Sequence, residues 1–132
     1  MAKPAPDYDM VLGSPVGRFG IRLHGERVTG VDYLPATRAL TPATSRFGDR
    51  VTREFEYYFT TAGYRFSVPV EMTGTTFQQR VWQVLMDIPV GEVRTYGELA
   101  SRLGSGARAV GNACRQNPVS IIVPCHRVVS AT

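Results

Sequence analysis

The tripeptide Cys125-His126-Arg127 is the segment of this sequence best suited to covalent chemistry. The thiolate of cysteine is a strong nucleophile, and a nearby imidazole or positive charge favours the thiolate over the thiol. Pro124 precedes the cysteine, and the apolar run Ile121-Ile122-Val123 comes before the proline. This pattern predicts a thiol at the end of a buried strand. Because side chains alternate between the two faces of a strand, contact between Cys125 and His126 requires a local turn or a bridging water.

A cysteine beside a histidine does not by itself establish catalysis, because a free cysteine is more often a small buried hydrophobic residue. The other cysteine, Cys114, follows Ala113 in a predicted helix, where packing is the expected role. Residues 1–9 are polar and contain no apolar segment that would serve as a secretory signal. Two cysteines without a signal favour free thiols in the cytoplasm over a disulfide.

Positive charge is concentrated near the end of the sequence. The 132 residues include 15 lysines and arginines against 11 acidic residues, a net charge of +4, with 43% hydrophobic residues. This composition is that of a globular protein, and no apolar run reaches the roughly 18 residues needed to cross a membrane. Residues 101–132 contain four arginines and no acidic residue. Such a segment suits a polyanion, although a solvated basic face gives the same pattern.

The first half of the sequence predicts strands followed by a helix. Apolar alternation predicts strands over 8–12, 19–23 and 28–34, and the short link between the second and third favours an antiparallel pair. Apolar residues spaced on one face from Phe47 to Phe59 predict a helix that ends near Gly63. Further along, Phe66, Val68 and Val70 alternate in the manner of another strand.

The second half predicts helices. The pairs Thr75 with Gln78 and Thr95 with Glu98 have the capping-box pattern, and each is followed by an apolar stripe at helical spacing. A third helix is expected over about 107–116. The two helices joined by residues 104–106 have the dimensions of a helix-turn-helix, although such a pair is often only core packing. A change of composition near residue 74 predicts two domains, 1–73 and 74–132.

Whole segments of the sequence resemble one family. Residues 122–129, Ile-Val-Pro-Cys-His-Arg-Val-Val, resemble the active-site signature of the O6-alkylguanine-DNA alkyltransferases, also called methylated-DNA–protein-cysteine methyltransferases. The segments 77–82, 88–92, 95–100, 107–111 and 117–119 resemble further motifs of this family, in the family's order. The first half matches more loosely, through 14–17 and 56–59. The resemblance therefore covers nearly the whole sequence.

The resemblance implies an α/β (α+β) protein with an N-terminal ribonuclease-H-like antiparallel sheet plus helix. A C-terminal winged-helix-like helix-turn-helix domain would bind double-stranded DNA that contains O6-alkylguanine. The implied activity is DNA repair by irreversible transfer of the alkyl group, usually methyl, to Cys125, so each molecule acts once. The protein would act as a cytoplasmic monomer, without a cofactor, a membrane or an obligate protein partner. Some relatives bind zinc through cysteine and histidine, but residues 1–73 contain only His24, so no metal is expected.

The resemblance also assigns roles to individual residues. Arg108 would fill the space that the flipped guanine leaves, Tyr96 would push the 3′ phosphate and hydrogen-bond the guanine, and His126 would take the thiol proton through a water. Asn117 would brace the turn before Cys125. The carbonyl groups of Cys125 and Val128 would accept from the guanine amino group. The implied DNA contacts are Thr95, Tyr96, Ala107, Arg108, Gly111 and Asn117.

Departures from the family leave alternatives open. Relatives usually continue past the signature with a glycine-rich loop and an acidic residue that orients the histidine, whereas this sequence ends at Thr132. On this ground we expect a truncated C-terminal domain, and a non-catalytic binder of alkylated DNA is the alternative function. Such binders carry tryptophan at the position of Cys125, which argues against that alternative. A thiol hydrolase that uses Cys125 and His126 is a third reading, but no oxyanion-type motif is evident. The turn 104–106 is also shorter than in many relatives, which would shift Arg108.

Overall fold

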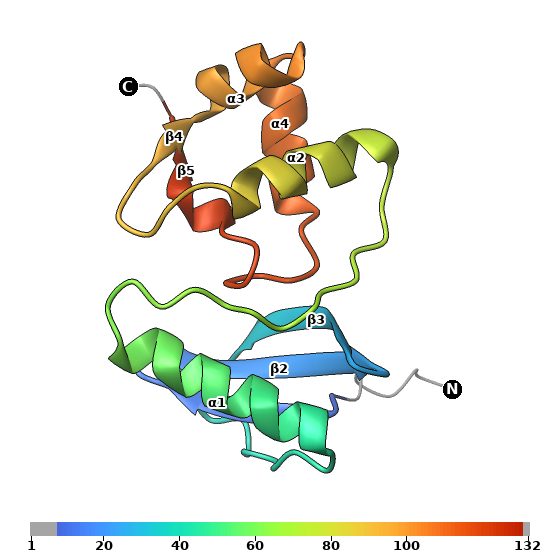
Figure 1. The fold of residues 1–132 in the computed structure, drawn as a ribbon, viewed down its shortest axis with the longest axis vertical. Coiled ribbons are helices and arrows are strands. Elements are labelled where there is room, and N and C mark those ends of the chain that lie inside the picture. Colours follow the sequence, from blue (N-terminus) through green and yellow to red (C-terminus); the bar gives the residue numbers. More distant parts are fainter. Residues whose placement is uncertain (1–7, 131–132) are drawn as a thin grey trace. The chain divides into compact units, whose positions relative to one another are not determined.

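The computed structural model describes residues 8–130, so most of the polar segment 1–9 lies outside the described residues. The chain divides into two compact units, Met1–Glu71 and Met72–Thr132. The first unit contains a sheet and a helix, and the second contains helices with one short strand pair (Figure 1). No helix within residues 8–130 is long and apolar enough to cross a bilayer.

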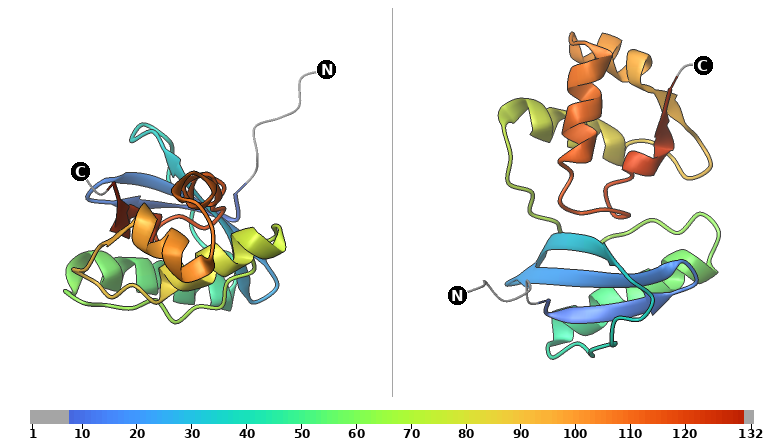
Figure 2. Two further views of the ribbon diagram at one scale, coloured as in Figure 1. Left: turned by 90° about the horizontal axis from the view of Figure 1, so that it is seen from above. Right: turned by 180° about the vertical axis from the view of Figure 1, so that it is seen from behind.

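The first unit is a three-stranded antiparallel sheet covered on one face by a helix. Strands β1 (Met10–Ser14), β2 (Gly17–His24) and β3 (Arg27–Leu34) lie in the order β1-β2-β3. Helix α1 (Arg46–Thr60) lies along one face of this sheet, as Figure 1 and the right view of Figure 2 show. The core between them consists of Met10, Phe19, Ile21, Val28, Val31, Val51 and Phe55. The predicted antiparallel strands and the helix after them are confirmed.

The strand predicted around residues 66–70 is wrong. Only an isolated bridge forms there, between Val28 and Val70. The Val28 N–H donates to the Pro69 carbonyl at 2.9 Å, and the Glu71 N–H donates to the Val28 carbonyl at 2.9 Å. Because Pro69 has no N–H, it cannot donate to a ladder, and the segment does not extend into a fourth strand.

A buried carboxylate fastens this segment to α1. Glu54 is 5% exposed and accepts from the Ser67 N–H at 2.6 Å, from the Ser67 hydroxyl at 2.9 Å and from Arg50 Nε at 3.2 Å. Burial raises the pKa of Glu54, but the hydrogen bonds from Ser67, Tyr64 and Arg50 together lower it below its ordinary value. Glu54 is therefore held as a carboxylate inside the first unit.

The second unit is built on three helices. They are α2 (Thr76–Met86), α3 (Tyr96–Leu103) and α4 (Ala107–Arg115). The Trp82 indole of α2 is buried and donates to the Ala113 carbonyl of α4 at 2.8 Å, which ties these two helices together. Gly104 ends α3 in the left-handed conformation with φ of 65°, as the predicted glycine stop requires.

The two predicted capping boxes differ. At α2 both hydrogen bonds are present: the Thr75 hydroxyl accepts from the Gln78 N–H, and the Gln78 side chain accepts from the Thr75 N–H. At α3 the Thr95 hydroxyl accepts from the Glu98 N–H, but the Glu98 carboxylate accepts from the Thr95 hydroxyl rather than from its backbone. Only half of the second box therefore forms. Thr95 also ends strand β4 (Arg94–Thr95), which pairs with β5 (Val128–Val129).

The buried strand predicted before Cys125 is also absent. Residues 120–123 form turns, in which the Ile122 N–H donates to the Ser120 carbonyl at 2.8 Å and the Val123 N–H donates to the Val119 carbonyl at 3.0 Å. Ile121 has a φ of 72°, in the left-handed region that a β-branched residue rarely adopts. A 3-10 helix, η1 (Cys125–Arg127), follows and leads into β5. Val119 forms only an isolated bridge, and the buried Ile122 and Val123 lie in these turns rather than in a strand.

Candidate active site

Cys125 begins η1 as a half-buried free thiol. Its Sγ lies 3.3 Å from the carbonyl oxygen of Cys114, to which the thiol donates. The side-chain amide of Asn117 donates to the same sulfur at 3.1 Å. The end of α4 and the turn after it therefore supply these two polar contacts of the sulfur.

Asn117 connects the end of α4 to the segment that carries Cys125. Besides its bond to the sulfur, its amide nitrogen donates to the Val123 carbonyl at 2.9 Å. Its carbonyl oxygen accepts from the Val119 N–H at 2.9 Å. These bonds close the loop between the helix and the thiol, and they set the position of Cys125 relative to α4.

The two cysteines have opposite acidities. A hydrogen bond from the Cys114 thiol lowers the pKa of Cys125, burial opposes this, and the Asn117 amide lowers it further, with a net lowering. The hydrogen bond to Cys125, burial and the charge of Cys125 all raise the pKa of Cys114. Cys125 therefore gives up its proton first, and the buried Cys114 remains a thiol.

His126 and Arg127 follow the thiol on the same short helix. His126 is exposed and, within residues 8–130, makes no hydrogen bond to Cys125. Partial desolvation and the positive charge of Arg127 lower the pKa of His126, so its imidazole is neutral at pH 7 and can accept a proton. The Arg127 guanidinium donates to the Ile88 carbonyl at 2.7 Å and anchors η1 to the segment after α2.

Tyr96, Thr95 and Val128 lie where α3 meets the strand pair. Tyr96 is the half-buried first residue of α3, and a Cβ added to Gly111 would lie 3.9 Å from its ring, so this ring faces α4. Thr95 caps the helix and pairs with Val129 across the strands. Val128 is buried and follows η1 directly. The strand pairing therefore brings the start of α3 beside the end of the cysteine segment.

An exposed basic face runs along α4. Arg108 lies in its first turn, and Arg108, Asn112 and Arg115 are spaced to share one side of the helix. All three are exposed, as is Ala107, and the Asn112 carbonyl accepts from the Arg115 guanidinium. Arg127 is the fourth arginine of the basic segment 101–132, and its guanidinium is instead hydrogen-bonded to the Ile88 carbonyl.

The structure brings together Cys125, Asn117 and Cys114, but it does not join His126 to the sulfur directly. The sequence predicts only a packing role for Cys114. No sequence pattern places its carbonyl against the Cys125 sulfur, because eleven positions separate the two residues. No group of three histidine, cysteine, aspartate or glutamate side chains in the described part of the chain is arranged to hold a metal.

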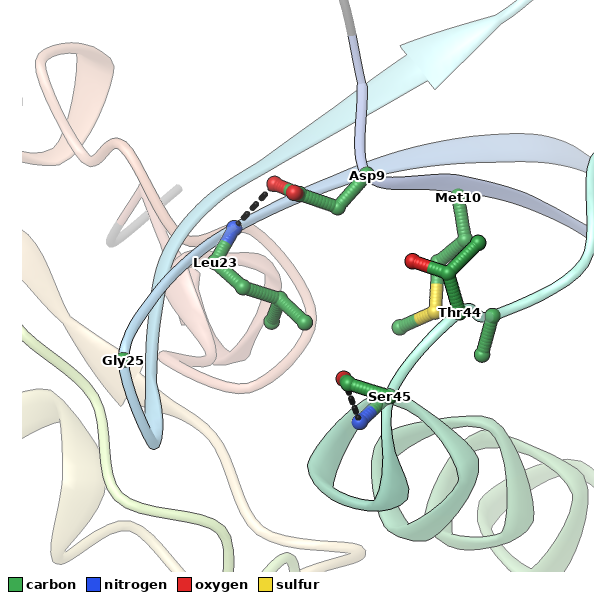
Figure 3. A pocket seen from close by; sticks show the side chains of 8 residues that line it. Asp9, Met10, Leu23, Gly25, Thr44 and Ser45 are labelled. Atoms are coloured by element: carbon green, nitrogen blue, oxygen red, sulfur yellow. Dashed lines mark hydrogen bonds between the residues drawn. The ribbon is translucent and has the colours of Figure 1, made fainter.

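A pocket in the first unit lies where α1 begins beside β1 and the β2–β3 turn (Figure 3). Two of its polar side chains, Asp9 and Ser45, are hydrogen-bonded within the chain. The Asp9 carboxylate accepts from the Leu23 N–H at 2.7 Å, and the Ser45 hydroxyl accepts from the Gly48 N–H at 3.0 Å. The pocket contains no nucleophilic thiol, and its hydrogen bonds hold the strand and the helix start together.

Comparison with known proteins identifies one family for this chain. Residues 76–132 match the family described as 6-O-methylguanine DNA methyltransferase, DNA binding domain. The methylated-DNA–protein-cysteine methyltransferase of Mycobacterium leprae is 40% identical over 128 residues, which cover 92% of this chain and 77% of the relative. The enzyme of the same name from Haemophilus influenzae is 42% identical over 130 residues, which cover 92% of this chain and 73% of the relative.

Solved structures give the same result. The crystal structure of the Mycobacterium tuberculosis O6-methylguanine methyltransferase superposes with a TM-score of 0.78 at 41% identity, and it covers 92% of this chain and 77% of that one. The structure of the Mycobacterium tuberculosis protein in complex with DNA superposes with a TM-score of 0.75 at 43% identity over the same shares. At these identities and coverages, the chain belongs to the family of methylated-DNA–protein-cysteine methyltransferases.

Proposed function

We propose that this protein repairs DNA by transferring the alkyl group of O6-alkylguanine irreversibly to Cys125. The observation that carries the proposal is the sulfur of Cys125, half buried, with a lowered pKa and with a donor amide from the turn that follows α4. A thiolate next to a DNA-binding helix pair is suited to attack a lesion that leaves the base stack. The family membership and the DNA complex of a relative support the same activity.

The reaction is an in-line displacement at the alkyl carbon. The Cys125 sulfur forms a bond to this carbon while the bond between the carbon and O6 breaks, and its electron pair goes to the guanine. The guanine then takes up one proton, which balances the proton that the thiol has lost. The products are guanine and S-alkylcysteine. Because the thioether is stable, one protein molecule repairs one lesion.

We assign the proton acceptor to His126, acting through a water, since its lowered pKa leaves the imidazole neutral and no direct bond to the thiol forms within residues 8–130. Asn117 holds the thiol. The carbonyl groups of Cys125 and Val128 accept from the guanine amino group, which selects guanine over adenine.

We assign DNA binding and alkyl acceptance to a C-terminal domain of residues 74–132. Residues 1–73 form the N-terminal α/β domain in this proposal. A base that reacts with a protein side chain has to leave the duplex stack, and Arg108, exposed on the first turn of α4, fills the gap. Tyr96 pushes the 3′ phosphate and hydrogen-bonds the guanine. The remaining DNA contacts come from Thr95, Ala107, Gly111 and Asn117. The DNA substrate and the free thiols favour the cytoplasm as the place of action.

The test is incubation with duplex DNA that contains one O6-methylguanine, followed by mass measurement of the peptide with Cys125. We expect one added methyl group per molecule, and no addition in Cys125→Ala, which should retain its affinity for DNA. Cys114→Ala serves as the matched control for loss of the other thiol, and its methylation should remain at Cys125. An unchanged mass while DNA stays bound would instead identify a binder of alkylated DNA.

A further inference from the structure

The buried indole of Trp82 is attached to the end of the helix that lies beside the acceptor thiol. Trp82 is 1% exposed, and its Nε1 donates to the Ala113 carbonyl of α4 at 2.8 Å. The last carbonyls of a helix lack the N–H groups of a following turn and need other donors. The Ala113 carbonyl also accepts from the Gln116 N–H, at the longer distance of 3.2 Å. The indole is therefore the closer of these two donors.

The next carbonyl along α4 is the one that contacts the thiol. The Cys114 carbonyl accepts from the Cys125 thiol at 3.3 Å and from the Asn117 N–H at 3.2 Å. Because each peptide unit is planar and the helix repeats it regularly, the adjacent carbonyls of Ala113 and Cys114 move together. A displacement of the carbonyl that Trp82 holds would therefore change the distance from the Cys114 carbonyl to the sulfur. It would also move Asn117, whose side chain donates to the same sulfur.

The far edge of the indole is enclosed as well. A Cβ added to Gly74 would lie 2.6 Å from Cη2 of Trp82 and 2.8 Å from its Cζ3, so the backbone at Gly74 lies directly against the ring. The ring therefore packs against the chain at one edge and donates from the other. The direction of its N–H is set by α2 and by the segment before it, and the end of α4 is located against that N–H.

We propose that Trp82 is a positioning residue for the Cys125 thiol. Its N–H holds the end of α4 at the point where the Cys114 carbonyl and the Asn117 amide meet the sulfur. This inference rests on the proposed function, since it concerns the position from which the sulfur attacks the alkyl carbon. An in-line displacement is sensitive to this position, because a misplacement of about 1 Å can lower a rate by about 100-fold. Loss of the N–H should therefore slow methyl transfer, although it removes no group that is proposed to contact DNA.

The test uses the fact that the sequence contains one tryptophan, so an analogue supplied in place of tryptophan during expression changes Trp82 alone. Benzothienylalanine resembles tryptophan in shape but carries sulfur in place of the N–H, so it cannot donate. The matched control is 4-fluorotryptophan, which keeps the N–H at nearly the same size. Trp82→Phe provides a second protein without the donor.

The first measurement is the single-turnover rate of methyl transfer with saturating O6-methylguanine duplex, at a temperature where urea denaturation shows each protein to be folded. We expect benzothienylalanine and Trp82→Phe to lower this rate by about 10-fold relative to the fluorotryptophan protein. The affinity for the duplex should change little, because phosphate contacts dominate it. A merely structural role would lower the unfolding free energy and leave the rate at saturation unchanged.

The second measurement is the carbon NMR signal of the Cys125 Cβ, in protein labelled at cysteine and without DNA. This signal should move when the N–H is lost and should stay in place in the fluorotryptophan protein. Cys114→Ala assigns the two cysteine signals.

An unchanged rate at saturation, or an unchanged Cys125 signal, would overturn the inference. If Trp82→Phe unfolds, the benzothienylalanine protein, which keeps the ring system, decides. Failure of both proteins to fold would also overturn it, since Trp82 would then be a purely structural residue. A wild-type protein that transfers no methyl group would refute the proposed function, whereas the cysteine signal would still test whether Trp82 sets the position of the sulfur.

Discussion

Asn117 donates its side-chain amide to the Cys125 sulfur at 3.1 Å, and this contact links the end of α4 to the acceptor thiol. The same amide nitrogen bonds the Val123 carbonyl, so one side chain both closes the loop and supports the thiolate. The helix that would contact DNA and the atom that would accept the alkyl group are therefore held in one hydrogen-bonded unit.

Replacing Asn117 should slow alkyl transfer. Asn117→Ala removes a donor from the thiolate, so we expect a raised Cys125 pKa and a transfer rate at pH 7 lower by about 3- to 10-fold. Asn117→Asp puts a negative charge beside the sulfur and should slow transfer further. The lost bonds to the backbone should also lower the unfolding free energy by about 1–3 kcal/mol.

Single-turnover rates and urea denaturation measure these two effects. Gln116→Ala is the control, because Gln116 is the exposed neighbour and, within residues 8–130, its side chain makes no hydrogen bond to the thiol. An Asp variant that transfers methyl as fast as the wild type would show that the Asn117 contact is unimportant for the reaction.

Arg108 and Arg115 lie on one side of α4, yet we expect different effects from their loss. Arg108→Ala should reduce repair of O6-methylguanine far more than it reduces binding to undamaged DNA, since it acts on base flipping. Arg115→Ala should weaken binding to both DNAs about equally and reduce the salt dependence by about one counterion. Transfer rates and titrations at several salt concentrations separate the two. If Arg108→Ala changed only the salt-dependent affinity, its role in flipping would be wrong.

The acidity of His126 should depend on Arg127. Desolvation and the Arg127 charge lower the pKa of His126, so its ring should titrate below the ordinary value of about 6.5. Arg127→Gln removes the charge and should raise this midpoint, whereas Arg127→Lys keeps the charge and should preserve it. The sequence contains two histidines, so NMR titration of the ring protons resolves His126 readily, with His126→Gln to assign it. Equal midpoints in the Gln and Lys variants would argue against the electrostatic cause.

Glu54 should make the stability of the first unit depend on pH. Its pKa in the folded chain is lowered from 4.5, so the unfolded chain takes up the proton first as the pH falls. The stabilisation is therefore complete above pH 4.5 and is lost as the pH falls through the lower folded value. Glu54→Gln should lower the unfolding free energy at pH 7 by about 1–3 kcal/mol and flatten its dependence on pH in the acidic range.

Urea denaturation at several pH values measures this effect. Glu56→Gln is the matched control, because Glu56 is exposed on the same helix and should leave the profile nearly unchanged. If the unfolding free energies of the wild type and of Glu54→Gln changed in parallel with pH, Glu54 would not be the source of the acid dependence.

Several elements were predictable from the sequence because neighbours in the chain determine them. The Thr75 capping box, the glycine stop at Gly104 and the antiparallel strands β2 and β3 depend on local hydrogen bonds and on the period of apolar residues. The Cys125 motif could likewise be recognised as a string of residues. The segment at 66–70 misled the prediction because Pro69 removes a donor that the apolar alternation does not reveal.

The surroundings of the thiol were decided by the tertiary structure. The turns at 120–123 replace the predicted strand. The Ile122 and Val123 N–H groups bond within the segment, and Cys125 lies against the end of α4. Cys114 and Asn117 meet the sulfur from eleven and eight positions away, and no periodic pattern records such a contact. The sequence by itself predicted the reactive sulfur, because residues 122–129 resemble the active-site signature of the family. Only the tertiary structure decided which groups contact the Cys125 sulfur, because the turn before Cys125 sets its position against α4. These contacts in turn determine the pKa of the thiol.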